Sequence, residues 1–353
     1  MFTETLADFV AHTRSPEIPD AVFMAARDAV MDTLAVALAG TLEPASVTAA
    51  RWVSEMGAAP QATLWGRETA TSIAEAAFGN GISSHALDFD DTHPGTRGHT
   101  SATLVPAVLA VGEATRAAGD EVLAAYALAH EVAAKIGRAL GPGHLERGWH
   151  PTATVGTFAA TAAASRLWRL DASALRRAWG IAASEASGLM RNFGTMTKPF
   201  HAGHAARCGI VAAWMARAGF TADESIFDGK GGFVEACRGE RTEPVEKLLG
   251  MLGKTWELLD PGNFVKRWPC CYSNHRAVGG LRALLDEHGV RTDEVTEIAV
   301  GFLPGTDTAL VSREPRTGLE GKFSVEYTLA ALLNDRALTL ETYTDAMVQR
   351  PAV

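Results

Sequence analysis

The sequence predicts a mainly α-helical protein with a large all-α domain and a smaller α/β (α+β) domain. Over about the first 220 residues, hydrophobic side chains recur every three or four positions, the spacing of amphipathic helices. Near Trp256 this pattern ends, and residues 295–302 alternate as a strand does. We therefore place the domains at residues 1–260 and 261–353 and expect the second to be incomplete, because no finishing element closes it.

Three early helices are expected at residues 20–38, 101–116 and 120–140. Their hydrophobic faces are, in order, Phe23, Val30, Leu34 and Leu38; Leu104, Val105, Val108 and Val111; and Val122, Tyr126, Ala129, Ala133 and Ile136. Gly40 suits a C-cap, and Asp171 suits the N-cap of a further helix. The small residues of 160–164 allow helices to approach closely, which favours a compact all-α body.

The second domain is expected to mix helices with a strand. Residues 276–288 and 323–333 have helical spacing. In the strand predicted at 295–302, Ile298, Val300 and Phe302 share one face. Joints rich in Pro and Gly separate these segments.

Composition and charge narrow the class of protein. The chain has 353 residues, is 47% hydrophobic and has a net charge of -9, which does not suit nucleic acid or an anionic membrane as a partner. No secretory signal and no hydrophobic run of membrane-spanning length is visible, so we expect a cytoplasmic protein. The four cysteines contain no C-x-x-C pair, so an iron–sulfur cluster is not expected and side chains must do any chemistry alone.

Carboxylates, a hydroxyl and imidazoles crowd residues 88–99, between two expected helices. They are Asp88, Asp90, Asp91, Thr92, His93 and His99. This mixture suits a proton-transfer site. Helix capping by Asp90 and Asp91 is the simpler structural explanation, and a divalent metal is a third possibility, since Asp and His are suitable ligands.

Two further segments place basic side chains next to prolines. His150 precedes Pro151, which favours an extended residue followed by a helix and presents the imidazole beside backbone N–H groups. Lys198 precedes Pro199, ahead of a helix that contains His201 and His204, and can bind a carboxylate or exchange protons. A helix-entry histidine packed on Trp149 is an equally good explanation of the first segment.

The junction between the expected domains is locally basic. Lys266, Arg267 and Arg276 surround Cys270 and His275, and arginine suits bidentate recognition of carboxylates. Ligand sites favour such junctions. A basic linker with buried cysteines is the alternative. Further along, Tyr327 would by itself be assigned to the core.

In order along the chain, these segments resemble the MmgE/PrpD family, which includes 2-methylcitrate dehydratase, cis-aconitate decarboxylase and iminodisuccinate epimerase. The resemblance rests on Asn80-Gly81 with 85–92, Gly148-Trp149-His150-Pro151, 197–207, Ala218-Gly219-Phe220-Thr221, Lys266 with Pro269-Cys270-Cys271 and His275-Arg276, and 322–327. It covers essentially the whole chain, and the first and third segments are highly specific.

The resemblance implies a large all-α domain with a smaller α/β lid, a homodimer, and an active site between the domains without metal or organic cofactor. Family members usually continue past the point where this chain stops, so the lid is expected to be incomplete. Carried onto this sequence, the family's active-site positions are Asp88, Thr92, His99, His150, Lys198, His275 and Tyr327.

The implied reaction is dehydration of a small hydroxy-polycarboxylic acid, such as 2-methylcitrate or citrate, by acid–base catalysis. The hypothesis assigns proton transfer to His150 and Asp88, with His99 and His275 as alternatives or as the acid. It assigns substrate binding to Lys198, Arg267, Arg276, Thr92 and Tyr327. Decarboxylation and epimerisation at the same site are alternatives. An inactive polycarboxylate-binding protein is a further alternative, and so is a metal-dependent hydrolase using the Asp/His loop of residues 88–99 with His201 and His204.

Overall fold

The computed structural model describes residues 1–351, which form two compact units. Unit 1 consists of Met1–Ala86, Asp90–Leu189 and Pro199–Val265. Unit 2 consists of Leu87–Phe89, Met190–Lys198 and the described residues from Lys266 onward. Both units are therefore discontinuous in sequence, and the short segment 87–89 leaves unit 1 in the middle of the carboxylate-rich loop.

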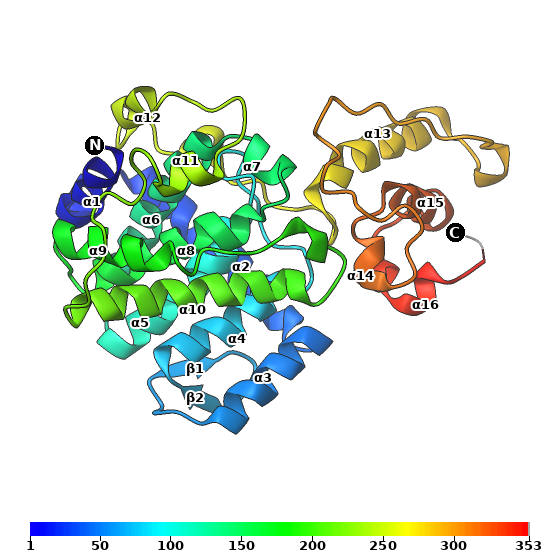
Figure 1. Ribbon diagram of the computed structural model, residues 1–353. Coiled ribbons are helices and arrows are strands. Elements are labelled where there is room, and N and C mark those ends of the chain that lie inside the picture. Colours follow the sequence, from blue (N-terminus) through cyan, green and yellow to red (C-terminus); the bar gives the residue numbers. More distant parts are fainter. Residues whose placement is uncertain (352–353) are drawn as a thin grey trace. The chain divides into compact units, whose positions relative to one another are not determined.

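Unit 1 is built mainly from helices (Figure 1). They are α1 (Phe2–His12), α2 (Asp20–Gly40), α3 (Pro44–Met56), α4 (Ile73–His85), α5 (Thr100–Thr115), α6 (Gly119–Leu140), α7 (Gly143–Glu146), α8 (Pro151–Leu167), α9 (Ala172–Ala182), α10 (Thr197–Arg217, its first two residues in unit 2), α11 (Phe233–Cys237) and α12 (Val245–Met251), with the short turns η1 (Ser15–Glu17) and η3 (Leu258–Gly262). The mainly α fold is confirmed, and Asp171 caps α9 by accepting a hydrogen bond from the Ala174 amide.

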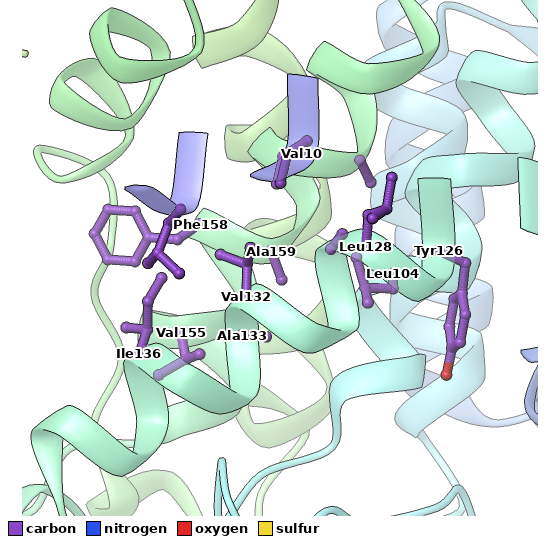
Figure 2. Packing of buried hydrophobic residues seen from close by; sticks show 14 of the residues in the cluster. Val10, Leu104, Tyr126, Leu128, Val132, Ala133, Ile136, Val155, Phe158 and Ala159 are labelled. Atoms are coloured by element: carbon purple, nitrogen blue, oxygen red, sulfur yellow. The ribbon is translucent and has the colours of Figure 1, made fainter. Parts of the chain in front are cut away.

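The core of unit 1 lies where α5, α6 and α8 pack together. Figure 2 shows Val132 and Ala133 of α6 close to Val155 and Ala159 of α8. Phe158 extends this cluster and is fully buried. Small side chains on these helices let the helices lie close together.

A β-hairpin that the sequence did not predict interrupts the helices of unit 1. β1 (Ala62–Leu64) pairs antiparallel with β2 (Thr69–Thr71). Each strand has three residues, too few for periodicity to reveal. Asn80 of α4 binds this hairpin: its amide accepts from the Trp65 N–H and donates to the Thr63 carbonyl.

Helices α4 and α10 approach each other through two glycines. A Cβ added to Gly203 would lie 2.2 Å from the Phe78 carbonyl oxygen, and one added to Gly81 would lie 2.7 Å from the Gly203 Cα. Neither distance is possible for a real side chain. Glycine at both positions therefore sets the spacing between the helix that ends at His85 and the helix that contains His201.

Unit 2 is also helical. It contains η2 (Met190–Asn192), α13 (Tyr272–His288), η4 (Thr292–Glu294), α14 (Gly318–Gly321), α15 (Val325–Asp335), η5 (Glu341–Tyr343) and α16 (Asp345–Val348). Its core joins Trp268, Val278 of α13, and Tyr327 and Leu332 of α15. These helices confirm the helical part of the sequence interpretation for this region.

The strand predicted at 295–302 was wrong: these residues adopt no regular secondary structure. The described part of unit 2 has no strand beside which this segment could form a hydrogen-bonded ladder. An alternating pattern needs such a partner to become a sheet. The α/β character expected of the smaller domain is therefore absent from its described residues.

Two other details of the sequence interpretation change. Gly40 is the last residue of α2 rather than its cap, and α10 begins at Thr197, so Lys198 lies inside its first turn rather than ahead of it. Among the described helices, none combines the length and the hydrophobicity needed to span a membrane.

Candidate active site

Four histidines of unit 1 meet where helices begin or end. His85 is the last residue of α4, His99 is the N-cap of α5, and His150 is the N-cap of α8. His201 lies on α10. Ring centroids are 4.3 Å apart for His85 and His99, 6.0 Å for His85 and His150, and 5.2 Å for His150 and His201. The rings therefore form a continuous series, which we call the histidine cluster.

Local sequence explains the position of His150. Pro151 occupies the first position of α8, and the residue before it is extended, with φ -96° and ψ 105°. The His150 amide donates to the Gly188 carbonyl at 3.0 Å. Its backbone geometry is therefore fixed by local sequence and by this bond, as the Pro151 pattern indicated.

Asp90 lies between two imidazoles of the histidine cluster. Nδ1 of His85 is 2.9 Å from Oδ1 of Asp90, and Nδ1 of His99 is 3.0 Å from Oδ2. Burial alone would raise the pKa of this carboxyl, but the two histidines outweigh it and hold the pKa well below its usual range. Asp90 is therefore an ionised, buried carboxylate that favours Nδ1–H on the rings that face it.

The Nδ1 atoms of His150 and His201 lie 2.9 Å apart, and both residues are buried. One nitrogen must donate and the other must accept. The two rings therefore hold opposite tautomers at this contact, and a proton on one is shared with the other.

Gly98 brings His99 close to the start of α8. A Cβ on this glycine would lie 2.9 Å from the Thr152 amide nitrogen. The His99 amide donates to Thr152 Oγ1 at 3.0 Å, in place of an intrahelical partner. The N-terminal ends of α5 and α8, and with them His99 and His150, are thereby held together.

The loop that holds Asp90 is supported by a buried polar network. Asp91 Oδ2 accepts from Ser101 Oγ at 2.5 Å and from Asn263 Nδ2 at 2.6 Å. Tyr126 and His130 extend the network, since Tyr126 bonds Ser101 and His130 bonds the Asn263 amide oxygen at 2.9 Å. Burial, with a contribution from neighbouring carboxylates, raises the pKa of Asp91 to about 7 against the effect of Ser101. Asp91 therefore has a structural role that does not require a fully ionised carboxylate.

Unit 2 contains a second polar cluster around Asp88. Oδ1 of Asp88 accepts from Lys198 Nζ at 2.7 Å, and Lys266 Nζ lies 3.3 Å from the same oxygen. Lys266 also donates to the Asp88 main-chain carbonyl at 2.5 Å. Asp88 has φ 50°, in the left-handed region that Asp tolerates better than most residues. We call Asp88 and its lysines the lysine cluster.

Lys322 completes the lysine cluster. Its Nζ donates to the Leu87 carbonyl at 2.6 Å and lies 3.3 Å from the Pro269 carbonyl. Aromatic rings surround Lys198: its Nζ is 5.3 Å from the centroid of Phe193 and 5.4 Å from that of Phe323. Three buried lysines and one aspartate make this part of unit 2 a cationic environment suited to carboxylates.

His275 lies in unit 2, with its Nε2 donating to the Trp268 carbonyl at 3.1 Å. Burial, and then the charge of Lys266, lower its pKa to about 4. At neutral pH this imidazole is therefore uncharged and is poorly suited to act as an imidazolium acid. Tyr327 is buried in the core of unit 2, and its hydroxyl donates to the Thr342 carbonyl.

The remaining predicted residues lie at more open positions. Thr92 in unit 1 pairs through its backbone with Phe264, in both directions, at 3.1 and 2.8 Å. Arg267 and Arg276 in unit 2 are exposed, and the Arg267 guanidinium lies 5.3 Å from the Trp268 ring centroid. The structure thus groups His99 with His150, and Asp88 with Lys198.

The sequence-based assignment of catalytic and substrate-binding residues left out five residues that the structure places in these clusters. They are His85, Asp90, His201, Lys266 and Lys322. A usable signal existed for the lysines: the chain has only seven, and three of them lie in segments that carry the family resemblance, yet only Lys198 was assigned to the active site. His85, Asp90 and His99 are also of types that bind divalent metals.

Two domain models of one protein family match the chain. The MmgE/PrpD N-terminal domain matches residues 4–245, and the MmgE/PrpD C-terminal domain matches residues 268–353. The chain belongs to the MmgE/PrpD family. This confirms the resemblance found from the sequence segments.

Relatives within the MmgE/PrpD family include several cis-aconitate decarboxylases. The human protein is 28% identical over 363 residues, an alignment that spans 99% of this chain and 74% of the human protein. The mouse protein is 27% identical over 99% of this chain and 73% of its own length. The Aspergillus terreus protein is 26% identical, over 99% of this chain and 76% of its own length.

Proposed function

We propose that this MmgE/PrpD protein is a lyase that acts on a small polycarboxylic acid by acid–base catalysis, with decarboxylation of a cis-aconitate-type acid as its first candidate reaction. The observation that supports this most is the stretch 85–90. These six consecutive residues supply His85 and Asp90 to the histidine cluster and Asp88 to the lysine cluster. One short segment thus contributes to the histidine cluster and also positions a lysine of the lysine cluster.

The histidine cluster supplies the acid. Because Asp90 is ionised and buried, it stabilises a positive charge on His99, and a protonated imidazole can act as an acid. His99 is also the member of the cluster that is partly exposed, whereas His85 is buried. We assign proton donation to His99, and we assign to His85 and Asp90 the task of holding its charge and tautomer.

The lysine cluster supplies the binding charge. Lys198 is positioned by Asp88 and by two phenylalanine rings, so its ammonium group is fixed rather than mobile. Asp88 is engaged by two lysines, so we assign it to positioning Lys198 rather than to proton abstraction. This changes the role that the sequence analysis gave to Asp88.

In the proposed decarboxylation, the bond between a carbon and its carboxylate breaks and carbon dioxide leaves. The electron pair remains on the carbon skeleton, where the carboxylates held by lysines stabilise it. A proton from His99 then completes the product. Positive charge that binds carboxylates and one acid are sufficient for these steps, and no external oxidant or reductant is required.

Dehydration of a 2-methylcitrate-type acid is the second candidate. It requires a base as well as an acid, because a C–H proton is removed before hydroxide leaves. The His150–His201 pair favours this candidate, since one of its Nδ1 atoms must accept a hydrogen bond and is therefore unprotonated.

We also expect a homodimer in the cytoplasm.

The test is proton NMR in heavy water with cis-aconitate, 2-methylcitrate, citrate and an epimerisable aspartate-type diacid. Loss of carbon dioxide with one deuterium incorporated would support decarboxylation. A new olefinic signal from methylcitrate would support dehydration, and inversion with exchange would point to epimerisation. Tight binding with no turnover and no exchange, in this chain and in a version extended at its C-terminus, would replace the lyase with a polycarboxylate-binding protein.

A further inference from the structure

A third group of chemically active side chains lies in unit 1, apart from the histidine cluster. Glu185 follows the end of α9, and His204 and Cys208 lie one turn apart on α10. One ligand atom from each of the three lies within 4.8 Å of the other two. No step proposed above uses any of them.

The distances within this group approach those of a tetrahedral metal site. Cys208 Sγ lies 3.4 Å from His204 Nε2 and 3.0 Å from Glu185 Oε2. For zinc bonds of about 2.3 Å to sulfur and about 2.0–2.2 Å to nitrogen and oxygen, the edges of the tetrahedron are roughly 3.3–3.6 Å. The Sγ–Nε2 separation already has this value, and the Sγ–Oε2 separation needs to open by about 0.5 Å.

We propose that Glu185, His204 and Cys208 bind one zinc-like divalent cation, with water in the fourth position. The donor set of one thiolate, one imidazole and one carboxylate matches the ligands that zinc takes in proteins. Thiolate and imidazole also select against magnesium and calcium, which prefer oxygen donors only. The sequence analysis expected no metal; the metal alternatives it considered were the Asp/His loop of residues 88–99 and the pair His201 and His204.

The surroundings orient the ligands. The Phe200 ring stacks on His204, with centroids 5.4 Å apart and planes 12° apart, which limits rotation of the imidazole. Cys208 is buried, whereas Glu185 and His204 are partly exposed, so an ion has a route from solvent. Because Glu185 and the α10 ligands come from separate segments, the ion would join the turn after α9 to α10.

Binding must release a proton. In the absence of metal the Cys208 thiol donates to Glu185, and burial together with that carboxylate raises its pKa. The metal–sulfur bond forms as the S–H bond breaks, and the proton passes to solvent.

Cobalt(II) is the probe, because a cobalt–thiolate bond gives a near-ultraviolet charge-transfer band that carboxylates and histidines do not give. Purified protein is titrated with cobalt(II) and, by calorimetry, with zinc. The variants are Cys208→Ser, His204→Gln and Glu185→Gln. Matched controls are Cys237→Ser, a cysteine elsewhere in unit 1, and His12→Gln, an exposed histidine on α1.

We expect one equivalent of cobalt with a charge-transfer band in the wild type and in both controls. Cys208→Ser should abolish the band, and the other two variants should weaken binding at least tenfold. A band that persists in Cys208→Ser, or a wild type without a band, would overturn the proposal. If Cys208→Ser does not fold, the His204 and Glu185 variants decide.

Zinc at the histidine cluster must be distinguished from zinc at this site. His99→Gln should leave the cobalt band and its stoichiometry unchanged, because His99 is not a ligand of the proposed ion. Cobalt that binds the wild type without the charge-transfer band, and that His99→Gln no longer binds, would assign the metal to the histidine cluster and refute the site described here. The test does not depend on turnover, so it stands whether or not the lyase proposal holds.

Discussion

His150 and His201 share a hydrogen bond between their Nδ1 atoms, 2.9 Å apart and buried. The ring of His201 therefore sets the tautomer of His150, although the two residues are 51 positions apart. Replacing a residue that sets the tautomer of a proton-transferring histidine should affect turnover more than substrate affinity.

His201→Phe should lower turnover about 10–100-fold and change substrate affinity less than about threefold. His201→Asn should retain more activity, because its amide can occupy the position of Nδ1. The measurement is kcat and KM over pH 5.5–9, with circular dichroism as a folding check. Equal activities for the Phe and Asn variants would show that His201 only fills space.

Asp90 and Asp91 are adjacent carboxylates with opposite environments. Asp90→Asn should reduce turnover about 100-fold or more, because an amide cannot hold Nδ1–H of both His85 and His99 toward itself. Asp91→Asn is the matched control. Its pKa near 7 means that the neutral form already serves, and an amide oxygen can accept from Ser101 and Asn263.

The two variants are compared with the wild type by their steady-state rates at pH 7, with the substrate that the protein accepts. The expected order is wild type, then Asp91→Asn with a loss below about fivefold, then Asp90→Asn. The reverse order would show that Asp91 is the carboxylate that matters for chemistry.

Local sequence predicted the features of the site that depend on neighbouring residues. Pro151 fixed the entry of α8 and hence the backbone of His150, and the helical spacing of 120–140 matched α6 within one residue. Contacts across the chain were not accessible in this way. Lys266 and Lys322 reach residues 87–88 from positions 178 and 235 residues away, and nothing in a single sequence indicates such pairings.

The strand predicted at 295–302 failed for a related reason. Alternation of Ile298, Val300 and Phe302 describes the surface that a strand would present, but a sheet also needs a hydrogen-bonded neighbour. The described part of unit 2 supplies none. The unpredicted hairpin of β1 and β2 is the opposite case, since its strands are short but each has its partner.

The Lys198–Asp88 pair should be coupled in stability. Both side chains are about 4% exposed, so removing one charge leaves the other in a poorly solvated position. Lys198→Met and Asp88→Asn should each lower the free energy of unfolding by about 3 kcal/mol. The double variant should lose less than the sum by at least about 1 kcal/mol.

Urea denaturation of the four proteins completes this cycle. Calorimetric titration of the folded Lys198→Met variant should in addition show substrate affinity reduced at least about tenfold, the value of a charge-assisted hydrogen bond. Strict additivity of the two stability losses would contradict direct coupling, and unchanged affinity would remove Lys198 from substrate binding.

The close approach of α4 and α10 can be tested by adding one methyl group. Gly203→Ala places a Cβ 2.2 Å from the Phe78 carbonyl oxygen and should cost about 1–3 kcal/mol of stability. Gly250→Ala in α12 is the control, because its Cβ would meet no atom within 4 Å and alanine favours helix. Comparable losses for both variants, measured as urea midpoints, would argue against a steric origin.

His130 should make stability depend on acidity in a defined window. Burial lowers its pKa to about 4, whereas an unfolded histidine titrates near 6.5, so the unfolded chain binds more protons between these values. Stability from this residue is therefore present above pH 6.5 and is lost as the pH falls toward 4, by up to about 3 kcal/mol.

His130→Gln keeps an N–H for Asn263 but cannot titrate. Urea unfolding at pH 4.5–7.5 should give a shallower pH dependence for this variant, though not a flat one, since burial also lowers the pKa of His275 to about 4. Identical slopes for variant and wild type would show that His130 is not a source of the acid sensitivity.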